Sequence, residues 1–186
     1  MTVFTPANEV TLLRMLLIPA FVIFVIYGHF GIALVVFMLA GITDALDGLL
    51  ARWSKQKSSV GAWLDPMADK LLLMSTFIVL SVPGLGLANR LPIWLTLCMI
   101  SRDIVIVLTV IIVNLAIGRR TFLPSIFGKI ATALYMLTAV AAMFFNYRRV
   151  HSPLVDVLVY ASLGITIVSS LDYIWRTRRV IEGAGA

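Results

Sequence analysis

The feature that most constrains this chain is a series of six apolar runs, each about as long as a lipid bilayer is thick. They cover residues 8–28, 31–53, 64–82, 91–117, 128–146 and 154–175. Because a helix needs about 20 apolar residues to cross the hydrocarbon core, each run predicts a membrane-spanning helix. Composition agrees, since 61% of the residues are hydrophobic, against roughly 45–50% in soluble domains. The sequence therefore predicts an all-α, polytopic membrane protein with six transmembrane helices.

The apolar runs leave little of the chain for anything else. The 186 residues consist almost wholly of these runs and short polar connections, so we expect one membrane domain over residues 1–186. The N-terminus lacks the pattern of a cleaved signal peptide, which predicts that the first span is retained. The lone Cys98 excludes an intrachain disulfide and a cysteine metal cage.

The positive charge of the chain indicates membrane topology. The net charge is +6, but the Lys and Arg residues lie mainly in the connections, which argues against nucleic-acid binding. An even number of spans places both termini on one side. That side would carry Arg52, Lys55, Lys57, Arg119, Arg120, Lys129, Arg176, Arg178 and Arg179, and the other side Arg90, Arg148 and Arg149. The positive-inside rule then predicts cytoplasmic termini, although Arg148 and Arg149 run against it.

Four of the nine acidic residues gather where the second and third runs approach the connection between them. Asp44 and Asp47 are three positions apart, and Asp65 and Asp69 are four apart, so on helices each pair shares a face. Carboxylates near hydrocarbon are costly unless they are paired or bound to metal. Oxygen ligands without histidine or cysteine favour Mg²⁺ or Mn²⁺, which commonly serve phosphate chemistry. The sequence therefore predicts a hard divalent cation site.

Simpler explanations exist for parts of this pattern. The acids could cap helices or pair with nearby lysines, and Asp65 before Pro66 is typical of a helix N-cap followed by proline. Four acids exceed what capping requires. Small residues recur on one face of the second run, and they allow either close helix packing or room for a nucleotide beside the acids. They are Gly41, Ala45, Gly48 and Ala51.

The acidic motif resembles a known family. Residues 44–52 read DALDGLLAR, and Gly61, Asp65 and Asp69 follow. This arrangement resembles the CDP-alcohol phosphatidyltransferase signature at every defined position, and such fixed residues at fixed spacing make a specific match. The predicted number of spans and the predicted cytoplasmic termini also resemble those of that family.

The resemblance implies a reaction and a set of roles. A phosphatidyl group would move from CDP-diacylglycerol to an alcohol acceptor, with release of CMP. Two Mg²⁺ or Mn²⁺ ions would be held by Asp44, Asp47, Asp65 and Asp69, and Asp69 would also be the general base. The CDP-lipid would be bound by Asp47, Gly48, Ala51, Arg52 and Gly61. For Arg52 the residues themselves allow a phosphate clamp or an arginine that only reaches the interface.

The acceptor is less tightly constrained by the sequence. Arg102 and Asp103 lie in the middle of a span, where charges are usually functional, although they could instead pair with charges on neighbouring helices. Arg119 and Lys129 add positive charge on the predicted cytoplasmic side. Together, Arg102, Arg119 and Lys129 predict binding of an acceptor that carries phosphate.

Two branches of the family use such acceptors. Residues 6–14, PANEVTLLR, resemble the opening of glycerol-3-phosphate phosphatidyltransferases, an opening shared with CDP-using cardiolipin synthases. Arg102-Asp103 and Pro124-Ser125 are more similar to the synthases. We favour glycerol 3-phosphate as the acceptor, with phosphatidylglycerol as the alternative.

Other readings fit less well. A small transporter would show polar residues through the midplane, repeated between halves, and this chain shows neither. The family resemblance also implies a homodimer, although no sequence pattern marks its interface. Because no transit peptide is evident, we expect a bacterial plasma membrane protein with its active site facing the cytoplasm.

Overall fold

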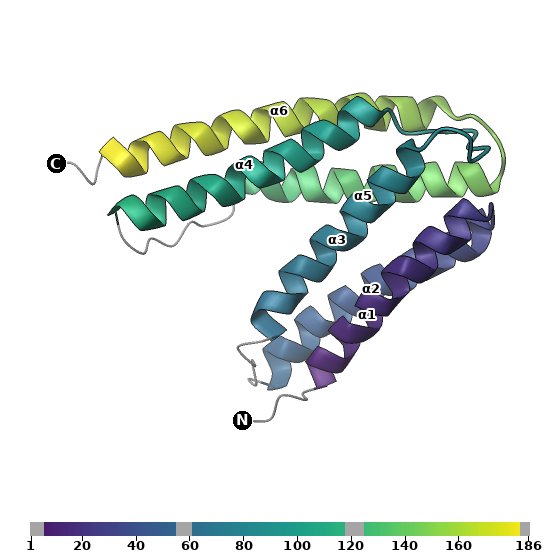
Figure 1. Ribbon diagram of the computed structural model, residues 1–186, viewed down its shortest axis with the longest axis horizontal. Coiled ribbons are helices and arrows are strands. Elements are labelled where there is room, and N and C mark those ends of the chain that lie inside the picture. The colour runs from purple at the N-terminus through teal and green to yellow at the C-terminus, as the bar shows by residue number, and fades with distance from the viewer. Residues whose placement is uncertain (1–5, 55–60, 118–124, 183–186) are drawn as a thin grey trace. The chain divides into compact units, whose positions relative to one another are not determined.

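The computed structural model describes residues 6–54, 61–117 and 125–182, with side chains described for 11–43, 67–115 and 125–178. The described residues form helices and no strand (Figure 1), which confirms the all-α prediction. The helices are α1 (Pro6–Ile26), α2 (Phe30–Ser54), α3 (Gly61–Ser81), α4 (Ile93–Ile117), α5 (Ile126–Tyr147) and α6 (Pro153–Glu182).

The helix bounds follow the apolar runs closely, with one exception. Five helices begin and end within three residues of the predicted spans. The prediction was wrong for α6, which continues to Glu182 instead of ending at 175. The added segment is rich in arginine, which forms helix well and needs no hydrocarbon around it. The apolar run therefore marked the span but not the whole helix.

The chain divides into two compact units. One comprises Met1–Arg90 and Ala139–Ser152, and the other comprises Leu91–Thr138 and Pro153–Ala186. The first unit contains α1, α2, α3 and the end of α5, and the second contains α4, the start of α5 and α6.

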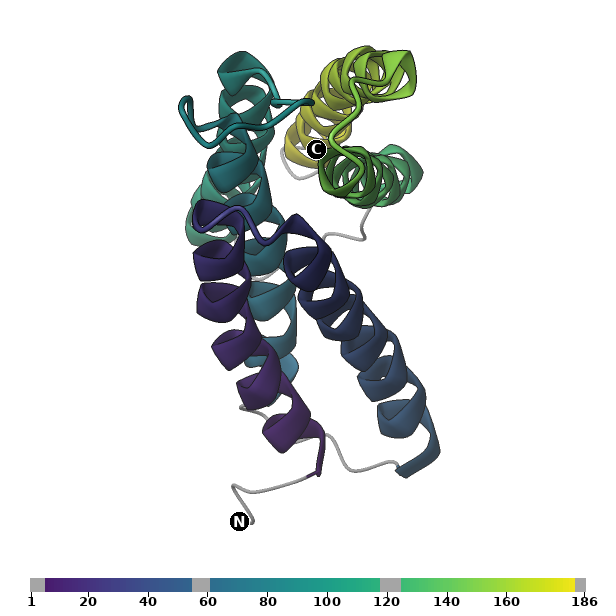
Figure 2. The same cartoon turned by 90° about the vertical axis from the view of Figure 1, so that its right-hand side faces the viewer.

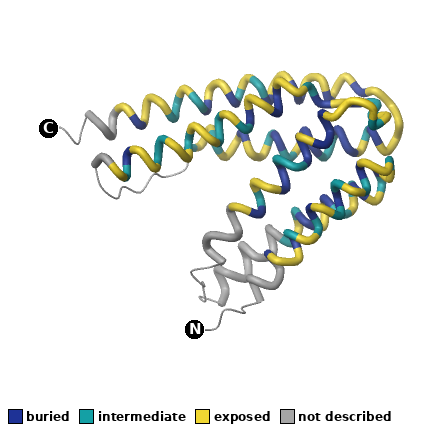
Figure 3. Tube along the Cα trace, in the orientation of Figure 1, coloured by how far each residue is buried: buried dark blue, intermediate teal, exposed yellow. Residues whose placement is uncertain are grey.

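In the first unit, α1 packs against α2 and α3 (Figures 1 and 2). Buried residues recur along α1 at intervals of three or four, which gives the helix one continuous packing stripe (Figure 3). The stripe consists of Thr11, Arg14, Ile18, Phe21 and Val25. The ring of Phe21 lies 5.7 Å, between centroids, from that of Phe37 on α2. The turn between α1 and α2 can close because Gly28 adopts a φ of 75°.

In the second unit, α4 packs against α6, and polar side chains join α5 to α6. Thr138 and Ser162 hydroxyls lie 2.9 Å apart, and the Tyr135 hydroxyl is hydrogen-bonded to Thr166. Such hydrogen bonds hold helices together where apolar surroundings provide no hydrophobic driving force.

The outward surfaces of the helices are apolar. Three helical segments are long and apolar enough to cross a membrane, namely Ile93–Leu115, Ile126–Tyr147 and Pro153–Arg178. Shorter apolar stretches lie in α1 and α2, at Thr11–Ile26 and Phe30–Thr43. Large side chains such as Ile112 and Leu115 are 63% and 83% exposed on α4, which water would not favour. These surfaces are those of a membrane protein.

Candidate active site

The acidic motif lies on two helices. Asp44 and Asp47 belong to α2, which continues to Ser54, and Asp65 and Asp69 belong to α3, which begins at Gly61. The helical condition behind the predicted pairing is therefore met, and each pair shares a helix face. The side chains of Asp44, Asp47, Asp65, Ala51 and Arg52 lie outside those that the structure describes, and the surroundings of Gly48 and Gly61 are likewise not described.

The start of α3 excludes one alternative for Asp65. An N-cap residue precedes the first helical residue, but α3 begins at Gly61, four residues before Asp65. Asp65 and Pro66 therefore lie inside the helix, and the capping explanation is wrong. The reason is that the helix extends four residues upstream of the position that the Asp-Pro pair suggested. Asp65 is left available for another role on the same face as Asp69.

Asp69 has a described side chain, and its partner comes from a different helix. Nη1 of Arg14 on α1 donates a hydrogen bond to Oδ1 of Asp69 at 2.7 Å. The Arg14 side chain is 0% exposed, whereas that of Asp69 is 43% exposed. The charge-assisted bond offsets the cost of burying the guanidinium and fixes the orientation of the carboxylate. A residue of α1 therefore fixes the Asp69 carboxylate, and part of the Asp69 side chain stays accessible.

Sequence reasoning did not assign Arg14 a role in the site. It appeared only as part of the opening pattern at 6–14. The sequence did contain a signal that Arg14 has a role, because an arginine within an apolar run requires a partner. Its spacing of three from Thr11 also places both residues on the buried stripe of α1.

A second polar cluster surrounds Arg102 in the second unit. Its side chain is 10% exposed, and Nη1 donates to Oδ1 of Asp103 at 2.8 Å. Nη2 donates to the hydroxyl of Ser169 on α6 at 2.6 Å. Among the described residues, Nε of Arg102 is buried and has no hydrogen-bond acceptor. A buried, unsatisfied N–H of a charged group is costly, so this atom would gain from a hydrogen bond to an anionic oxygen.

Gly128 permits the close approach of Arg102 to the start of α5. A Cβ atom at this position would lie 3.1 Å from Nη2 of Arg102 and 3.3 Å from Oγ of Ser125. Ser125 is the N-cap of α5, since its Oγ accepts the Gly128 N–H at 2.9 Å. A guanidinium therefore lies beside the positive end of a helix, which makes this part of the second unit electropositive.

The structure places the other predicted acceptor residues less specifically. Lys129 follows Gly128 in the first turn of α5 and is exposed. Arg119 lies outside the described residues. The alternative for Arg102, pairing with a charge on a neighbouring helix, is not what the described residues show, because its carboxylate partner Asp103 is on α4 itself. Gly128 and Ser169 had no predicted role, and Ser125 entered the sequence analysis only through the resemblance of Pro124-Ser125 to the synthases.

The described side chains do not by themselves form a metal centre. Among them, no group of three or more His, Cys, Asp or Glu residues is placed to hold a metal ion. Of the four predicted ligands only the side chain of Asp69 falls within this set.

Comparison with known proteins gives one family. Residues 4–168 match the model of the CDP-alcohol phosphatidyltransferase family. A protein of Mycobacterium tuberculosis named probable phosphatidylglycerophosphate synthase is 33% identical over 183 residues, covering 95% of this chain and 83% of the relative. A CDP-diacylglycerol–glycerol-3-phosphate 3-phosphatidyltransferase of Haemophilus influenzae is 33% identical, covering 88% of each chain. Human cardiolipin synthase (CMP-forming) is also 33% identical, covering 92% of this chain and 54% of the relative.

Proposed function

The chain belongs to the CDP-alcohol phosphatidyltransferase family, and on that premise we propose that it makes phosphatidylglycerophosphate. The 1-hydroxyl of glycerol 3-phosphate attacks the phosphorus that bears the diacylglycerol. The bond from that phosphorus to the CMP oxygen breaks, and CMP leaves with the bonding electrons.

The observation that carries the choice of acceptor is the position of Arg102, whose guanidinium lies beside the N-terminus of α5 and has an unsatisfied Nε–H. A phosphate monoester offers several anionic oxygens to one guanidinium, so it can satisfy this atom without breaking the bonds to Asp103 and Ser169. The adjacent N-terminus of α5 favours the same charge. Lys129, in that first helical turn, and Arg119 are proposed to contribute further positive charge toward the acceptor.

Relatives are named for both candidate reactions. Those named for phosphatidylglycerophosphate synthesis match this chain over 83% and 88% of their own length, whereas human cardiolipin synthase matches over 54%. Phosphatidylglycerol is the second candidate acceptor, because the cardiolipin synthase is equally identical in sequence. The Arg102-Asp103 pair also favours that branch.

The donor set fits a hard divalent cation. Three of the proposed ligands are carboxylates on helix faces, and the fourth, Asp69, is held in place by Arg14. Carboxylate oxygens without nitrogen or sulfur ligands suit Mg²⁺ or Mn²⁺. Asp44, Asp47, Asp65 and Asp69 would hold two such ions. When bound, the metal neutralises charge on the diphosphate and on departing CMP.

The protein's own residues then supply orientation and proton transfer. Asp69 accepts the proton of the attacking hydroxyl, and Arg14 keeps its carboxylate turned toward the reacting atoms. Gly48 and Ala51 leave room for cytidine beside the acids. Gly61 leaves room for the diphosphate. Arg52, about one turn beyond Asp47 on α2, clamps a phosphate oxygen of the CDP-lipid.

We further propose the topology and location. Residues 1–186 form one membrane domain with six spans and cytoplasmic termini, as the distribution of arginine and lysine favours. The active site then faces the cytoplasm of a bacterium, where water-soluble glycerol 3-phosphate and CMP are found. A homodimer is proposed from the family resemblance alone.

An acceptor assay tests the proposed function. Purified protein is supplied with CDP-diacylglycerol and, in separate reactions, glycerol 3-phosphate or phosphatidylglycerol, and lipid products are identified by mass spectrometry. We expect phosphatidylglycerophosphate and CMP in equal amounts from the first reaction. Cardiolipin as the faster product would assign the second candidate, and no CMP in either reaction would refute phosphatidyl transfer.

The same assay tests the metal. Exhaustive chelation should abolish CMP release, and added Mg²⁺ or Mn²⁺ should restore it, because four carboxylates around a diphosphate need neutralising charge. Ca²⁺ is the matched control, since its longer bonds and flexible geometry suit the proposed site less well. Full turnover after chelation would rule out the metal centre.

A further inference from the structure

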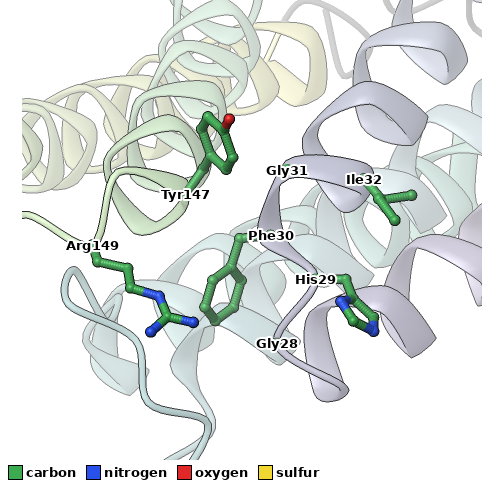
Figure 4. Close-up of a pocket in the computed structure, with 7 residues that line it drawn as sticks. All are labelled: Gly28, His29, Phe30, Gly31, Ile32, Tyr147 and Arg149. Atoms are coloured by element: carbon green, nitrogen blue, oxygen red, sulfur yellow. The ribbon is translucent and has the colours of Figure 1, made fainter.

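A cavity of about 300 Å³ lies in the first unit (Figure 4). We call it the turn cavity, because it adjoins the turn between α1 and α2 and the end of α5. Its lining consists of Gly28, His29, Phe30, Gly31, Ile32, Tyr147 and Arg149. Phe30 precedes Asp44 by 14 positions on α2, which is about 21 Å at 1.5 Å per residue. The turn cavity is therefore separate from the proposed catalytic site.

The lining is chemically suited to an anion. The Arg149 guanidinium is exposed and forms no ion pair with a described carboxylate. Figure 4 shows this side chain extending from the end of α5 toward Phe30, with Tyr147 nearby and the His29 ring on the other side. Guanidinium groups bind phosphate with two parallel hydrogen bonds, which ordinary surface lysines do not.

One wall of the cavity depends on a glycine. A Cβ atom on Gly31 would lie 2.8 Å and 2.9 Å from two ring carbons of Tyr147, closer than packed atoms approach. The absence of a side chain at Gly31 therefore lets the Tyr147 ring lie directly on the first turn of α2. The cavity has a packed wall and is more than a gap between mobile side chains.

The backbone that carries Arg149 has an unusual conformation. Helices α1 and α5 end in the same way, with a residue in the left-handed region and a hydrogen bond from the following N–H to a carbonyl five residues back. In α1 that residue is Gly28, with φ 75°, but in α5 it is Arg149, with φ 53°. Glycine is favoured at such a position. Arg149 therefore adopts a backbone conformation that residues with a side chain rarely adopt.

Buried hydrogen bonds hold the segment around Arg149 in place. The Asn89 N–H donates to Oδ1 of Asn146 at 2.7 Å, and Nδ2 of Asn146 donates to the Asn89 carbonyl at 3.1 Å. Nδ2 of Asn89 donates to the Val150 carbonyl at 2.7 Å, and the Ser152 N–H donates to Oδ1 of Asn89 at 2.8 Å. These bonds fix the residues on both sides of Arg149, which lowers the entropy cost of binding.

We propose that the turn cavity binds a phosphate group, carried by a lipid headgroup at the membrane surface or by phosphate in solution. Arg149 forms the charge-assisted contact at the mouth of the cavity. The proposal accounts for a feature that the transferase reaction does not use. Under the predicted topology Arg149 lies on the side where arginine is disfavoured, and a phosphate partner gives a reason for its presence there.

Arg149→Gly is the informative variant, because glycine removes the guanidinium and suits the left-handed backbone. Arg149→Asn is a second variant that tolerates the same conformation. The matched control is Arg148→Ala, which removes the neighbouring exposed arginine without altering the cavity lining. Thermal unfolding of each purified protein confirms that the fold is retained.

Binding is measured by native mass spectrometry of the detergent-solubilised protein. The probes are dioctanoyl phosphatidylserine, inorganic phosphate and dioctanoylglycerol, which lacks phosphate. We expect at least one phosphate probe to bind more tightly than dioctanoylglycerol. Arg149→Gly and Arg149→Asn should each weaken that binding about tenfold or more, and Arg148→Ala should leave it unchanged.

The probes distinguish the two sources of phosphate. A loss seen with phosphatidylserine assigns a lipid headgroup, and a loss seen only with inorganic phosphate assigns dissolved phosphate. Equal affinities for the wild-type and Arg149→Gly proteins would overturn the proposal. So would an equal loss in Arg148→Ala, because that result would mean non-specific attraction to a basic surface. No CDP-lipid is present, so the outcome does not depend on the transferase assignment.

Discussion

The two units each bury an arginine within an apolar helix, but the arginines have different kinds of partner. Arg14 in the first unit is 0% exposed and pairs with Asp69 from another helix. Arg102 in the second unit is 10% exposed and pairs with the next residue, Asp103, while a neutral hydroxyl of Ser169 anchors it to α6. Both pairs satisfy charge in an apolar setting, and only the first joins two helices through opposite charges.

The difference indicates different roles. Arg14 is tied to a carboxylate of the proposed catalytic set, so it acts on the reaction by orienting Asp69. The Arg102 pair lies on one helix, and its guanidinium lies beside the N-terminus of α5, whereas the Nε–H groups of both arginines are buried and lack an acceptor among the described residues. A positioning arginine should therefore affect turnover, and a binding arginine should affect the affinity for one substrate.

Arg14→Ala should have the largest effect. Loss of a buried, charged hydrogen bond is expected to lower the free energy of unfolding by about 1.5–3 kcal/mol. Because Asp69 loses its fixed orientation, kcat should fall about 10- to 100-fold, with a smaller change in the KM for CDP-diacylglycerol. Steady-state kinetics and thermal unfolding measure both effects. Arg14→Lys, which keeps the charge but not the planar fork, should lie between. An unchanged kcat in Arg14→Ala would remove Arg14 from the mechanism.

Arg102→Ala should act mainly on the acceptor. We expect the KM for glycerol 3-phosphate to rise about tenfold or more, because a charge-assisted contact to phosphate is lost. The KM for CDP-diacylglycerol should change much less, since Arg102 lies outside the nucleotide motif. Equal increases for both substrates would show that Arg102 has a structural role, and the contrast with Arg14 would then fail.

Gly128→Ala should produce a smaller change of the same kind. The added Cβ would lie 3.1 Å from Nη2 of Arg102, so the guanidinium must move by a few tenths of an ångström. We expect the acceptor KM to rise by roughly two- to fivefold, less than in Arg102→Ala. Gly164→Ala on α6 is the matched control, because its Cβ would meet nothing within 4 Å. An effect of equal size in the control would exclude the close approach as the cause.

Much of the fold could be predicted because membrane helices are long and apolar. The number of helices in the described residues and most of their bounds followed from run length alone. The end of α6 did not, because helix can continue past the hydrocarbon once arginine replaces apolar residues. The start of α3 was predicted within three residues, but the Asp65-Pro66 pair suggested an N-cap at a position that lies inside the helix.

The candidate site was predictable in its chemistry but not in its contacts. Spacing placed Asp65 and Asp69 on one helix face, and the mid-span position of Arg102 marked it as unusual. Neither pattern could identify the partner of Arg14. A cation in an apolar run requires a carboxylate, but the sequence does not say which carboxylate it is. The approach of Arg102 to Gly128 was hidden as well, since a close contact between helices depends on packing and has no sequence period.

The central claim is that Asp69, oriented by Arg14, takes the proton of the acceptor hydroxyl, and Asp69→Asn tests it most directly. CDP-diacylglycerol affinity and the single-turnover rate are measured on the same purified sample. The amide cannot accept a proton, so the rate should fall by roughly 10²–10⁴ while CDP-lipid affinity stays near that of the wild type. Loss of lipid binding together with metal would instead make Asp69 primarily a metal ligand. A single-turnover rate equal to that of the wild type would contradict the mechanism.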